Sequence, residues 1–176
     1  MADEIINRVA NSKLVTFNLE DHYPEGKRTE LDISPWLLEG IVLKEKEFRQ
    51  YVKEHDWSLY QDGYLAVYNS SEAIIPAWAL MLISLNAAPY TKKVVAGRLA
   101  DLEMVIFTEL IDKLDLSSLE DKPVVIKGCT GKFIPENAYL LLAQKLRPIA
   151  KSIMYGEACS SVPLFKAARG LSLIHI

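Results

Sequence analysis

Three short apolar segments that end in glycine recur along the chain at nearly constant spacing. They occupy residues 93–97, 124–128 and 152–156, so their glycines stand 31 and 28 residues apart. Each interval has room for one α-helix and the strand that follows it. Strands that alternate with helices are typical of βαβ units with a parallel sheet. The spacing therefore predicts an α/β fold.

Helical patterns fill the intervals between these segments. Residues 99–110 carry apolar side chains at the spacing of one helix face, and Pro76 and Pro135 each stand where a helix begins. A further strand is predicted at residues 64–68. We therefore expect the order β-α-β-α-β-α-β over residues 63–156, in a three-layer fold with a mainly parallel sheet and right-handed crossovers.

The first sixty residues follow a different pattern. Short strands are predicted at residues 13–18 and 30–33, and an amphipathic helix is predicted at residues 44–55. No stretch rich in Pro, Gly or Ser separates this part from the rest of the chain. We expect this N-terminal segment to add strands and helices to a single α/β domain that spans residues 1–166.

The last ten residues need separate treatment. Residues 171–176 read Leu-Ser-Leu-Ile-His-Ile, which is one translated frame of a common sequencing adaptor. We therefore expect residues 167–176 to be a non-native tail, and His175 is excluded from the search for ligands.

Composition and charge exclude several classes of protein. The chain has 20 basic and 23 acidic residues and a net charge of −3, so a basic surface for nucleic acid is not expected. The longest apolar run, residues 73–88, would span about 24 Å as a helix, less than the roughly 30 Å of a hydrocarbon core. The acidic N-terminus lacks the pattern of a secretory signal. We expect a cytoplasmic protein that binds neither nucleic acid nor membrane and keeps its thiols reduced.

The carboxyl ends of the predicted strands are the expected place for a ligand. In open α/β folds, ligands bind where parallel strands end, along one edge of the sheet. The segments that follow the predicted strands are rich in small and polar residues. At this edge we expect the ligand-binding residues Ser70, Ser71, Gly97, Gly128, Thr130, Gly156, Glu157 and Ser160.

Both cysteines of the chain fall at this predicted edge. Cys129 and Cys159 each stand within three residues of a glycine that ends a predicted strand. If the two strands are neighbours, about 4.8 Å apart, the thiols approach each other. They can then bind a soft metal ion or carry a persulfide. The alternative is that both are small apolar residues that fill the core.

Several catalytic and metal-binding motifs are missing from the sequence. Residues 128–132 read Gly-x-x-Gly-Lys, which is two residues short of a phosphate-binding loop. The chain has no Cys-x-x-Cys, His-Glu-x-x-His or Gly-x-Ser-x-Gly. A hydrolytic or transfer enzyme would have to use His22 or His55, which both stand among acidic residues. The sequence leaves open whether the chain is an enzyme.

Five segments of the chain are similar to those of one known family. They are residues 7–12, 55–57, 73–79, 123–129 and 150–159, the last of which is followed by Val162-Pro163-Leu164. Through them the chain resembles the bacterial proteins catalogued as domain of unknown function 2480, over roughly residues 1–166. The resemblance implies a small cytoplasmic protein encoded near genes for sulfur mobilisation and iron–sulfur assembly. Relatives often carry a further cysteine just before the third segment. This chain has none there, which argues against a three-thiolate site.

Two functions follow from these residues and this resemblance. The first is an accessory factor in iron–sulfur cluster or sulfur metabolism. Cys129 and Cys159 would hold iron–sulfur or zinc, or accept persulfide, and iron–sulfur assembly proteins would be the partners. The alternative is a non-catalytic α/β module that binds a small molecule or a protein and whose cysteines are structural. Exposed edge strands would allow either kind of protein to form a homo-oligomer.

Overall fold

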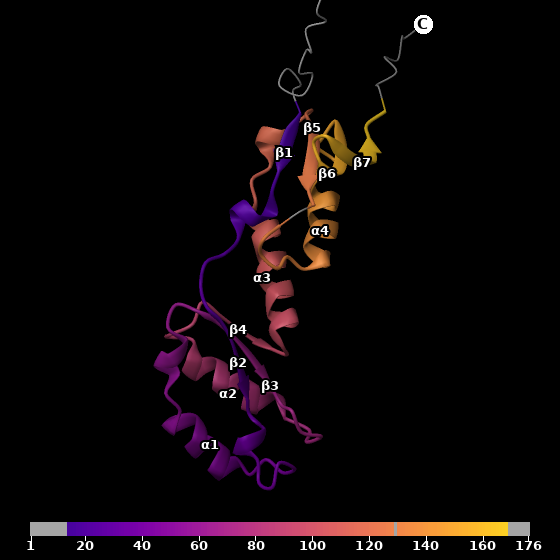
Figure 1. The fold of residues 1–176 in the computed structure, drawn as a ribbon. Helices are drawn as coiled ribbons and strands as arrows, with labels where there is room; N and C mark the ends of the chain where they lie inside the picture. Colours follow the sequence, from indigo (N-terminus) through magenta and orange to yellow (C-terminus); the bar gives the residue numbers. More distant parts are fainter. Residues whose placement is uncertain (1–13, 129, 169–176) are drawn as a thin grey trace, which may run out of the picture. The chain divides into compact units, whose positions relative to one another are not determined.

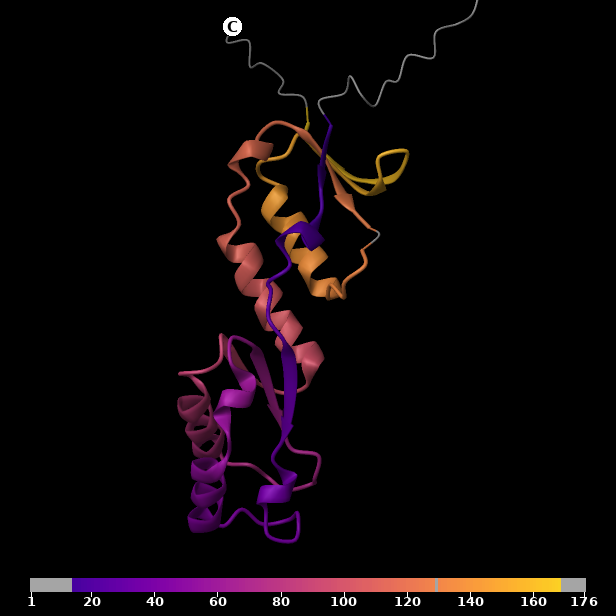
Figure 2. The same ribbon diagram turned by 60° about the vertical axis from the view of Figure 1, so that its left-hand side comes forward.

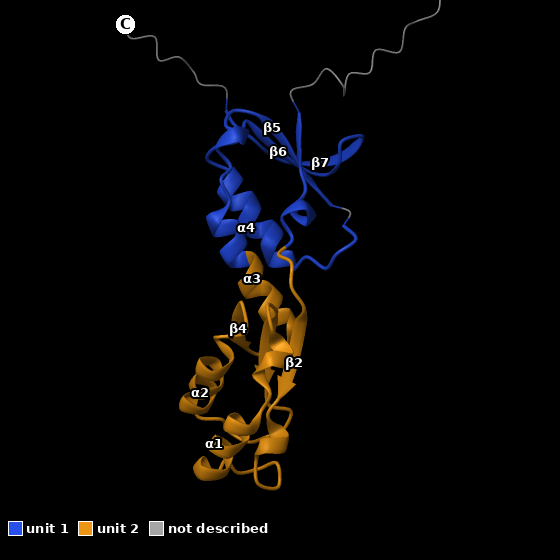
Figure 3. Ribbon diagram, turned by 90° about the vertical axis from the view of Figure 1, so that its left-hand side faces the viewer, with its two compact units in different colours: residues 1–23, 108–176 blue, residues 24–107 orange. Residues whose placement is uncertain are grey.

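The computed structural model describes residues 14–128 and 130–168 (Figure 1). The chain divides into two compact units, which Figure 3 distinguishes by colour. Unit 1 contains residues 1–23 and 108–176, and unit 2 contains residues 24–107. Each unit is built around a sheet of its own.

Unit 1 is built on a four-stranded sheet with the order β1-β5-β6-β7. Its strands are β1 (Val15–Phe17), β5 (Pro123–Lys127), β6 (Ser152–Glu157) and β7 (Ser160–Lys166). The first three run parallel, and β7 returns antiparallel to β6. In β5, Val124, Val125 and Ile126 are all buried, as expected of a parallel strand covered on both faces. Helix α4 (Glu136–Leu146) lies against β6, where the rings of Tyr139 and Tyr155 are 5.7 Å apart.

Unit 2 has a sheet of three parallel strands in the order β2-β3-β4. Its strands are β2 (Arg28–Asp32), β3 (Tyr64–Tyr68) and β4 (Lys93–Ala96). Helices α1 (Glu45–Glu54) and α2 (Ala77–Ala87) lie on the same side of the sheet (Figures 1 and 2), where Phe48 and Ile83 are buried in the core. A second apolar cluster joins Ala66 of the sheet to Leu102 and Ile106 of α3 (Leu99–Lys113).

The helices begin and face the core as their sequences predict. Pro76 and Pro135 stand immediately before α2 and α4, at a position where the missing N–H of proline costs no hydrogen bond. In α1, Phe48 and Val52 are four residues apart and are both buried, so they form one apolar face. The predicted helices at these three places are confirmed.

The predicted order of elements is also confirmed, but the predicted single sheet is replaced by two. Residues 63–156 follow the order β3-α2-β4-α3-β5-α4-β6, and most strands are parallel. However, β3 and β4 belong to the sheet of unit 2, whereas β5 and β6 belong to that of unit 1. The reason is that β1 pairs with β5 and β2 pairs with β3. Such long-range pairing is not encoded in hydrophobic periodicity. The three-layer order around one sheet is not confirmed.

Three further expectations concern the limits of the chain and its surroundings. The chain divides into two compact units. This division does not test whether residues 1–166 form a single domain, which stays a prediction. Of the expected tail at residues 167–176, positions 169–176 lie outside the described residues. Within the described ranges, every helix is too short or too polar to cross a bilayer.

A substitution at Gly97, which follows β4, tests the backbone geometry of unit 2. Its φ is +132°, and a Cβ there would collide with the side chain of Asp101, which accepts a hydrogen bond from the Arg98 N–H. We expect Gly97→Ala to lower the free energy of unfolding by about 2–3 kcal/mol, because it adds backbone strain and displaces this carboxylate. Chemical denaturation followed by circular dichroism measures the loss.

The control is Gly40→Ala. Gly40 also has a positive φ, but open space surrounds the position of its missing Cβ. A loss of only about 1 kcal/mol is expected there. Equal losses in the two variants would contradict the role assigned to the contact with Asp101.

Candidate functional site

The carboxyl ends of β2 and β3 meet at one edge of the unit 2 sheet, and Asp32 links them. Its carboxylate accepts hydrogen bonds from the N–H of Ser34 (2.9 Å), the N–H of Ser70 (3.1 Å) and the hydroxyl of Ser70 (2.6 Å). Burial acts to raise the pKa of Asp32, but the hydrogen bonds from Ser70 and Ser34 outweigh it and lower the pKa from its ordinary value. Asp32 therefore stays ionised and holds two loops together.

The loop after β3 is fixed by the side chain of Asn69. Its amide donates hydrogen bonds to the carbonyls of Ser71 (3.1 Å) and Ala73 (2.9 Å). Its carbonyl oxygen accepts bonds from the N–H (3.1 Å) and the hydroxyl (2.8 Å) of Ser71. Such Asn-centred turns hold a short loop in one conformation. The sequence analysis did not single out Asn69, although Asn before two serines is a turn signal.

At the end of β4, the N-terminus of α3 is capped by carboxylates of the chain itself. Glu30 accepts a hydrogen bond from the N–H of Leu99 (2.9 Å) and forms an ion pair with the guanidinium of Arg98 (3.1 Å). Asp101 accepts one from the N–H of Arg98 (2.8 Å). The guanidinium also lies 3.8 Å from the centre of the Tyr68 ring. The helix terminus is thus already satisfied by negative charge.

At the corresponding edge of unit 1, a carboxylate of the chain again accepts hydrogen bonds from the backbone. The carboxylate of Glu20, in the short 3₁₀ helix η1 (Leu19–His22), accepts hydrogen bonds from the N–H of Gly131 at 3.1 and 3.2 Å. The Thr130 hydroxyl donates to the carbonyl of Lys132 (3.0 Å), and the Lys132 ammonium lies 4.6 Å from the centre of the Tyr23 ring. The second glycine of the Gly-x-x-Gly-Lys segment is therefore bound by a glutamate.

The two strands that precede the cysteines are neighbours. β5 and β6 are parallel and adjacent, with Lys127 opposite Gly156, as the thiol hypothesis requires. The Tyr155 ring lies against Gly128, and a Cβ at that position would be 3.0 Å from the ring, which would have to shift by a few tenths of an ångström. Cys159 is exposed in the turn between β6 and β7. Cys129 lies outside the described residues.

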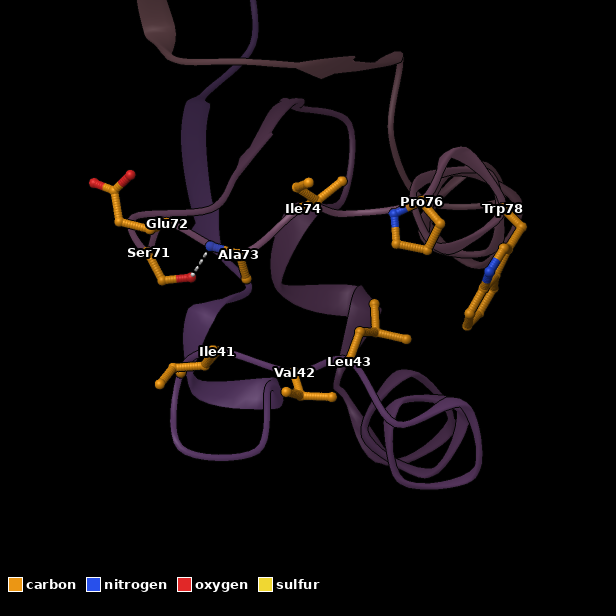
Figure 4. A pocket seen from close by; sticks show the side chains of 10 residues that line it. Ile41, Val42, Leu43, Ser71, Glu72, Ala73, Ile74, Pro76 and Trp78 are labelled. Atoms are coloured by element: carbon orange, nitrogen blue, oxygen red, sulfur yellow. Dashed lines mark hydrogen bonds between the residues drawn. The ribbon is translucent and has the colours of Figure 1, made fainter.

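An apolar groove of about 810 Å³ opens in unit 2 between the turn that precedes α1 and the loop that precedes α2 (Figure 4). Ile41 and Val42 form one wall and Ile74 forms the opposite one. Ile74 is 92% exposed and Ile41 69%, values that are unusual for large apolar side chains gathered at one place. Of the lining residues that the structure describes, Glu72 alone is charged.

Hydrogen bonds hold one wall of the groove in place, and aromatic packing holds the other. The turn is closed by hydrogen bonds between Leu38 and Val42 (2.8 and 3.2 Å), and it places Glu39 and Gly40 at φ of +54° and +70°. On the other side, Trp78 packs edge-to-face on Phe48, with ring centres 5.9 Å apart. The groove is therefore part of the folded unit rather than a gap between loose loops.

The predicted ligand-binding residues fall at two sheet edges instead of one. Ser70, Ser71 and Gly97 lie at the edge of the unit 2 sheet. The others lie at that of unit 1: Gly128, Thr130, Gly156, Glu157 and Ser160. Within the described ranges, no three His, Cys, Asp or Glu side chains are grouped as metal ligands. The groove was missed, because its apolar residues resemble core residues in the sequence.

The two histidines considered for catalysis lie in aromatic surroundings. His22 stacks on Phe17, with ring centres 5.1 Å apart. The Nε2 of His55 is 2.8 Å from the Tyr60 hydroxyl, and the ring packs against Trp57 at 4.7 Å. Burial lowers the pKa of His55, although the charge of Asp56 opposes this. His55 is therefore partly buried and packs against two aromatic residues of the unit 2 core, Trp57 and Tyr60.

The comparison with known families agrees with the resemblance seen in the sequence. The chain matches the family model described as protein of unknown function (DUF2480) over residues 3–167. The chain belongs to this family. No curated protein and no solved structure matches it. Membership of this family assigns no activity to the chain. The groove and the sheet edges are the features that indicate a function.

The hydrogen bonds to Asp32 make stability depend on pH in acid. Because its pKa is lowered in the folded chain, the stabilisation is complete above about pH 4 and is lost as the pH falls further. We expect Asp32→Asn to lower Tm by about 2–5 °C at pH 7. The difference from the unmodified chain should shrink as the pH falls from 4 to 3. Thermal melts across this range measure it.

The matched control is Glu72→Gln, which removes an exposed carboxylate from the loop that follows Ser70. Its melting temperature should follow that of the unmodified chain at every pH. An Asp32→Asn difference that stays constant down to pH 3 would show that the carboxylate charge does not contribute.

Proposed function

We propose that the chain is a binding module for another protein, and that the groove of unit 2 takes an apolar segment of that partner. The observation that carries the proposal is the exposure of Ile74, Ile41 and Val42 on facing walls. Exposed apolar side chains are ordinary when they are scattered, but a cluster around a groove marks an interaction surface. This corresponds to the protein-binding alternative raised by the sequence.

The rigidity of the walls supports binding. Glu39 adopts a left-handed conformation that costs a non-glycine residue free energy, and it does so in a turn that presents Ile41 to solvent. The bonds of Asn69 fix the loop that leads to Ile74. A surface that is already ordered loses little conformational entropy when a partner binds.

The charge at the groove indicates the chemistry of the partner. Glu72 lines it, and Glu39 stands in the turn beside it. A segment with two or more large apolar residues next to a Lys or Arg would bury its apolar side chains between the walls and pair its charge with Glu72. A second copy of the chain would bring these glutamates together, and an anionic lipid surface would be repelled by them.

A random dodecapeptide library displayed on phage tests this proposal with the full chain as target. We expect the selected peptides to combine large apolar residues with Lys or Arg. Their synthetic forms should bind Ile74→Glu at least tenfold more weakly than the unmodified chain, because the carboxylate would have to be buried without a partner. Fluorescence anisotropy gives the affinities.

Two further variants sharpen the test. Leu59→Glu changes another large apolar residue that is exposed (64%) and lies outside the groove, and it should leave binding unchanged. Glu72→Lys should weaken the basic peptides and not uncharged ones. Selected peptides without this composition, equal binding to Ile74→Glu, or binding of the chain to phosphatidylglycerol vesicles would contradict a protein partner in the groove.

A second candidate function rests on the adjacency of β5 and β6. We propose that Cys129 and Cys159 act together in the cytoplasm, in an accessory factor for iron–sulfur cluster or sulfur metabolism that works with iron–sulfur assembly proteins. As thiolates they would supply two soft ligands for iron or zinc, and a partner would complete the four that these metals take. As a sulfur acceptor, one thiolate would attack the terminal sulfur of a donor persulfide. The donor's S–S bond breaks as the new S–S bond forms, and the donor's inner sulfur leaves as a thiolate.

Metal and sulfide content tests the second candidate. We expect iron or zinc, with labile sulfide in the case of a cluster, in anaerobically purified full chain, and we expect it to be lost in Cys129→Ser and Cys159→Ser. Ala158→Ser in the same turn should retain it. A double serine variant with full metal content would contradict thiolate ligation. If the unmodified chain holds no metal and takes up no sulfur from polysulfide, the thiol function is wrong.

A further inference from the structure

Helix α2 has an outward face that is unusual for a surface helix. None of its 11 residues is charged, and Ala77, Met81 and Leu85 are exposed at intervals of four residues, which places them on one line. Met81 is 63% exposed and Leu85 is 73% exposed. Helices that are apolar on all sides are normally buried on all sides. This stripe therefore has the composition of a covered surface.

The strand next to this helix is an open edge of its sheet. Among the described residues, β4 pairs with β3 alone. The N–H of Gly97 donates to the carbonyl of Val67. Because successive peptide groups of a strand point in opposite directions, the N–H groups of Val94 and Ala96 point away from β3. Edge strands are usually protected by proline, bulges or several charges, whereas β4 has only Lys93.

A hollow lies between the stripe and the edge. It measures about 210 Å³ and is lined by Val67, Leu80, Met81, Ser84, Val94 and Ala96. Its position shows that α2 does not extend over the whole of β4. The side chains of Val94 and Ala96 are thus left partly open on the face of the sheet that α2 covers elsewhere.

We propose that this face of unit 2 binds a second copy of the chain. The β4 strands of the two copies pair antiparallel across a two-fold axis and form one six-stranded sheet, and the two α2 helices pack side by side over the seam. Pairing centred on Val95 places Val94 opposite Ala96, with their outward N–H and C=O groups bonded to each other. It also places Lys93 opposite Gly97 and, beyond the paired residues, Lys92 opposite Arg98, whose guanidinium forms an ion pair with Glu30 in its own chain.

The surface fits a second copy better than a foreign partner. A two-fold interface must be complementary to itself, and an open strand edge beside an uncharged helix and a hollow meets that condition without any matching charges. An 11-residue helix and a four-residue strand make a small surface, so we expect the interface to bury about 600 Å² per copy, at the lower end of stable interfaces. We therefore expect a dissociation constant between about 1 and 100 μM.

Sedimentation equilibrium of the full chain from about 1 to 200 μM tests the proposal. The unmodified chain should change from monomer to dimer over this range. Leu85→Glu and Met81→Glu should each raise the dissociation constant more than tenfold, because each places a charge in the seam. Both residues are exposed, so these changes leave the core intact, and thermal melts at low concentration confirm the fold. Leu59→Glu and Ile74→Glu should dimerise normally.

Hydrogen exchange provides an independent measurement of the strand pairing. At 200 μM the amides of Val94 and Ala96 should exchange more slowly in the unmodified chain than in Leu85→Glu, while those of β3 should not change. A monomer up to 200 μM, a dimer that persists in both α2 variants, or a dimer that Ile74→Glu dissociates would overturn the proposed interface. Because Ile74 lies in the groove and Leu85 does not, failure of this interface and failure of the proposed peptide site are separable.

Discussion

The parallel pairing of β1 with β5 is the constraint on which the division of the chain depends. Thr16 lies opposite Val125, so 109 residues separate two partners in the same sheet. All of unit 2, residues 24–107, lies within this loop. Unit 1 is consequently assembled from two distant parts of the chain, and unit 2 is a continuous insertion between them. Neither glycine spacing nor helix periodicity reveals this, because both describe only local order.

Carboxylates occupy the hydrogen-bonding positions where ligands usually bind in α/β proteins. In unit 2, Glu30 accepts from the N–H of Leu99 at the start of α3, and in unit 1, Glu20 accepts from the N–H of Gly131. In many folds of this class, the same kinds of N–H group bind a phosphate or another anion. Here they are satisfied within the chain, so the exposed groove beside α2 is a better candidate for binding than either edge.

The features of the fold that could be predicted from the sequence are those that local chemistry determines. Pro76 and Pro135 mark helix starts wherever they lie in the fold, and the apolar run of β5 identifies a buried strand. β7 was not predicted, because Pro163 is atypical of a strand and is tolerated only at an edge. The groove could not be predicted either, since the exposure of Ile41 and Ile74 depends on a left-handed turn and on the bonds of Asn69. The sequence could not show that the strands before Cys129 and Cys159 are neighbours, because strand pairing depends on the topology of the sheet.

The insertion of unit 2 into unit 1 also sets an order of folding. When residue 107 has left the ribosome, every strand of the unit 2 sheet is present, whereas β1 still lacks β5, β6 and β7. Closing a long flexible loop is entropically costly and slows folding. Once unit 2 has folded, however, Arg28 donates hydrogen bonds to the carbonyl of Pro24 and to Glu103, so the two ends of unit 2 are joined and the loop that must be closed is shorter. We therefore expect β1 to pair with β5 more readily once unit 2 has folded.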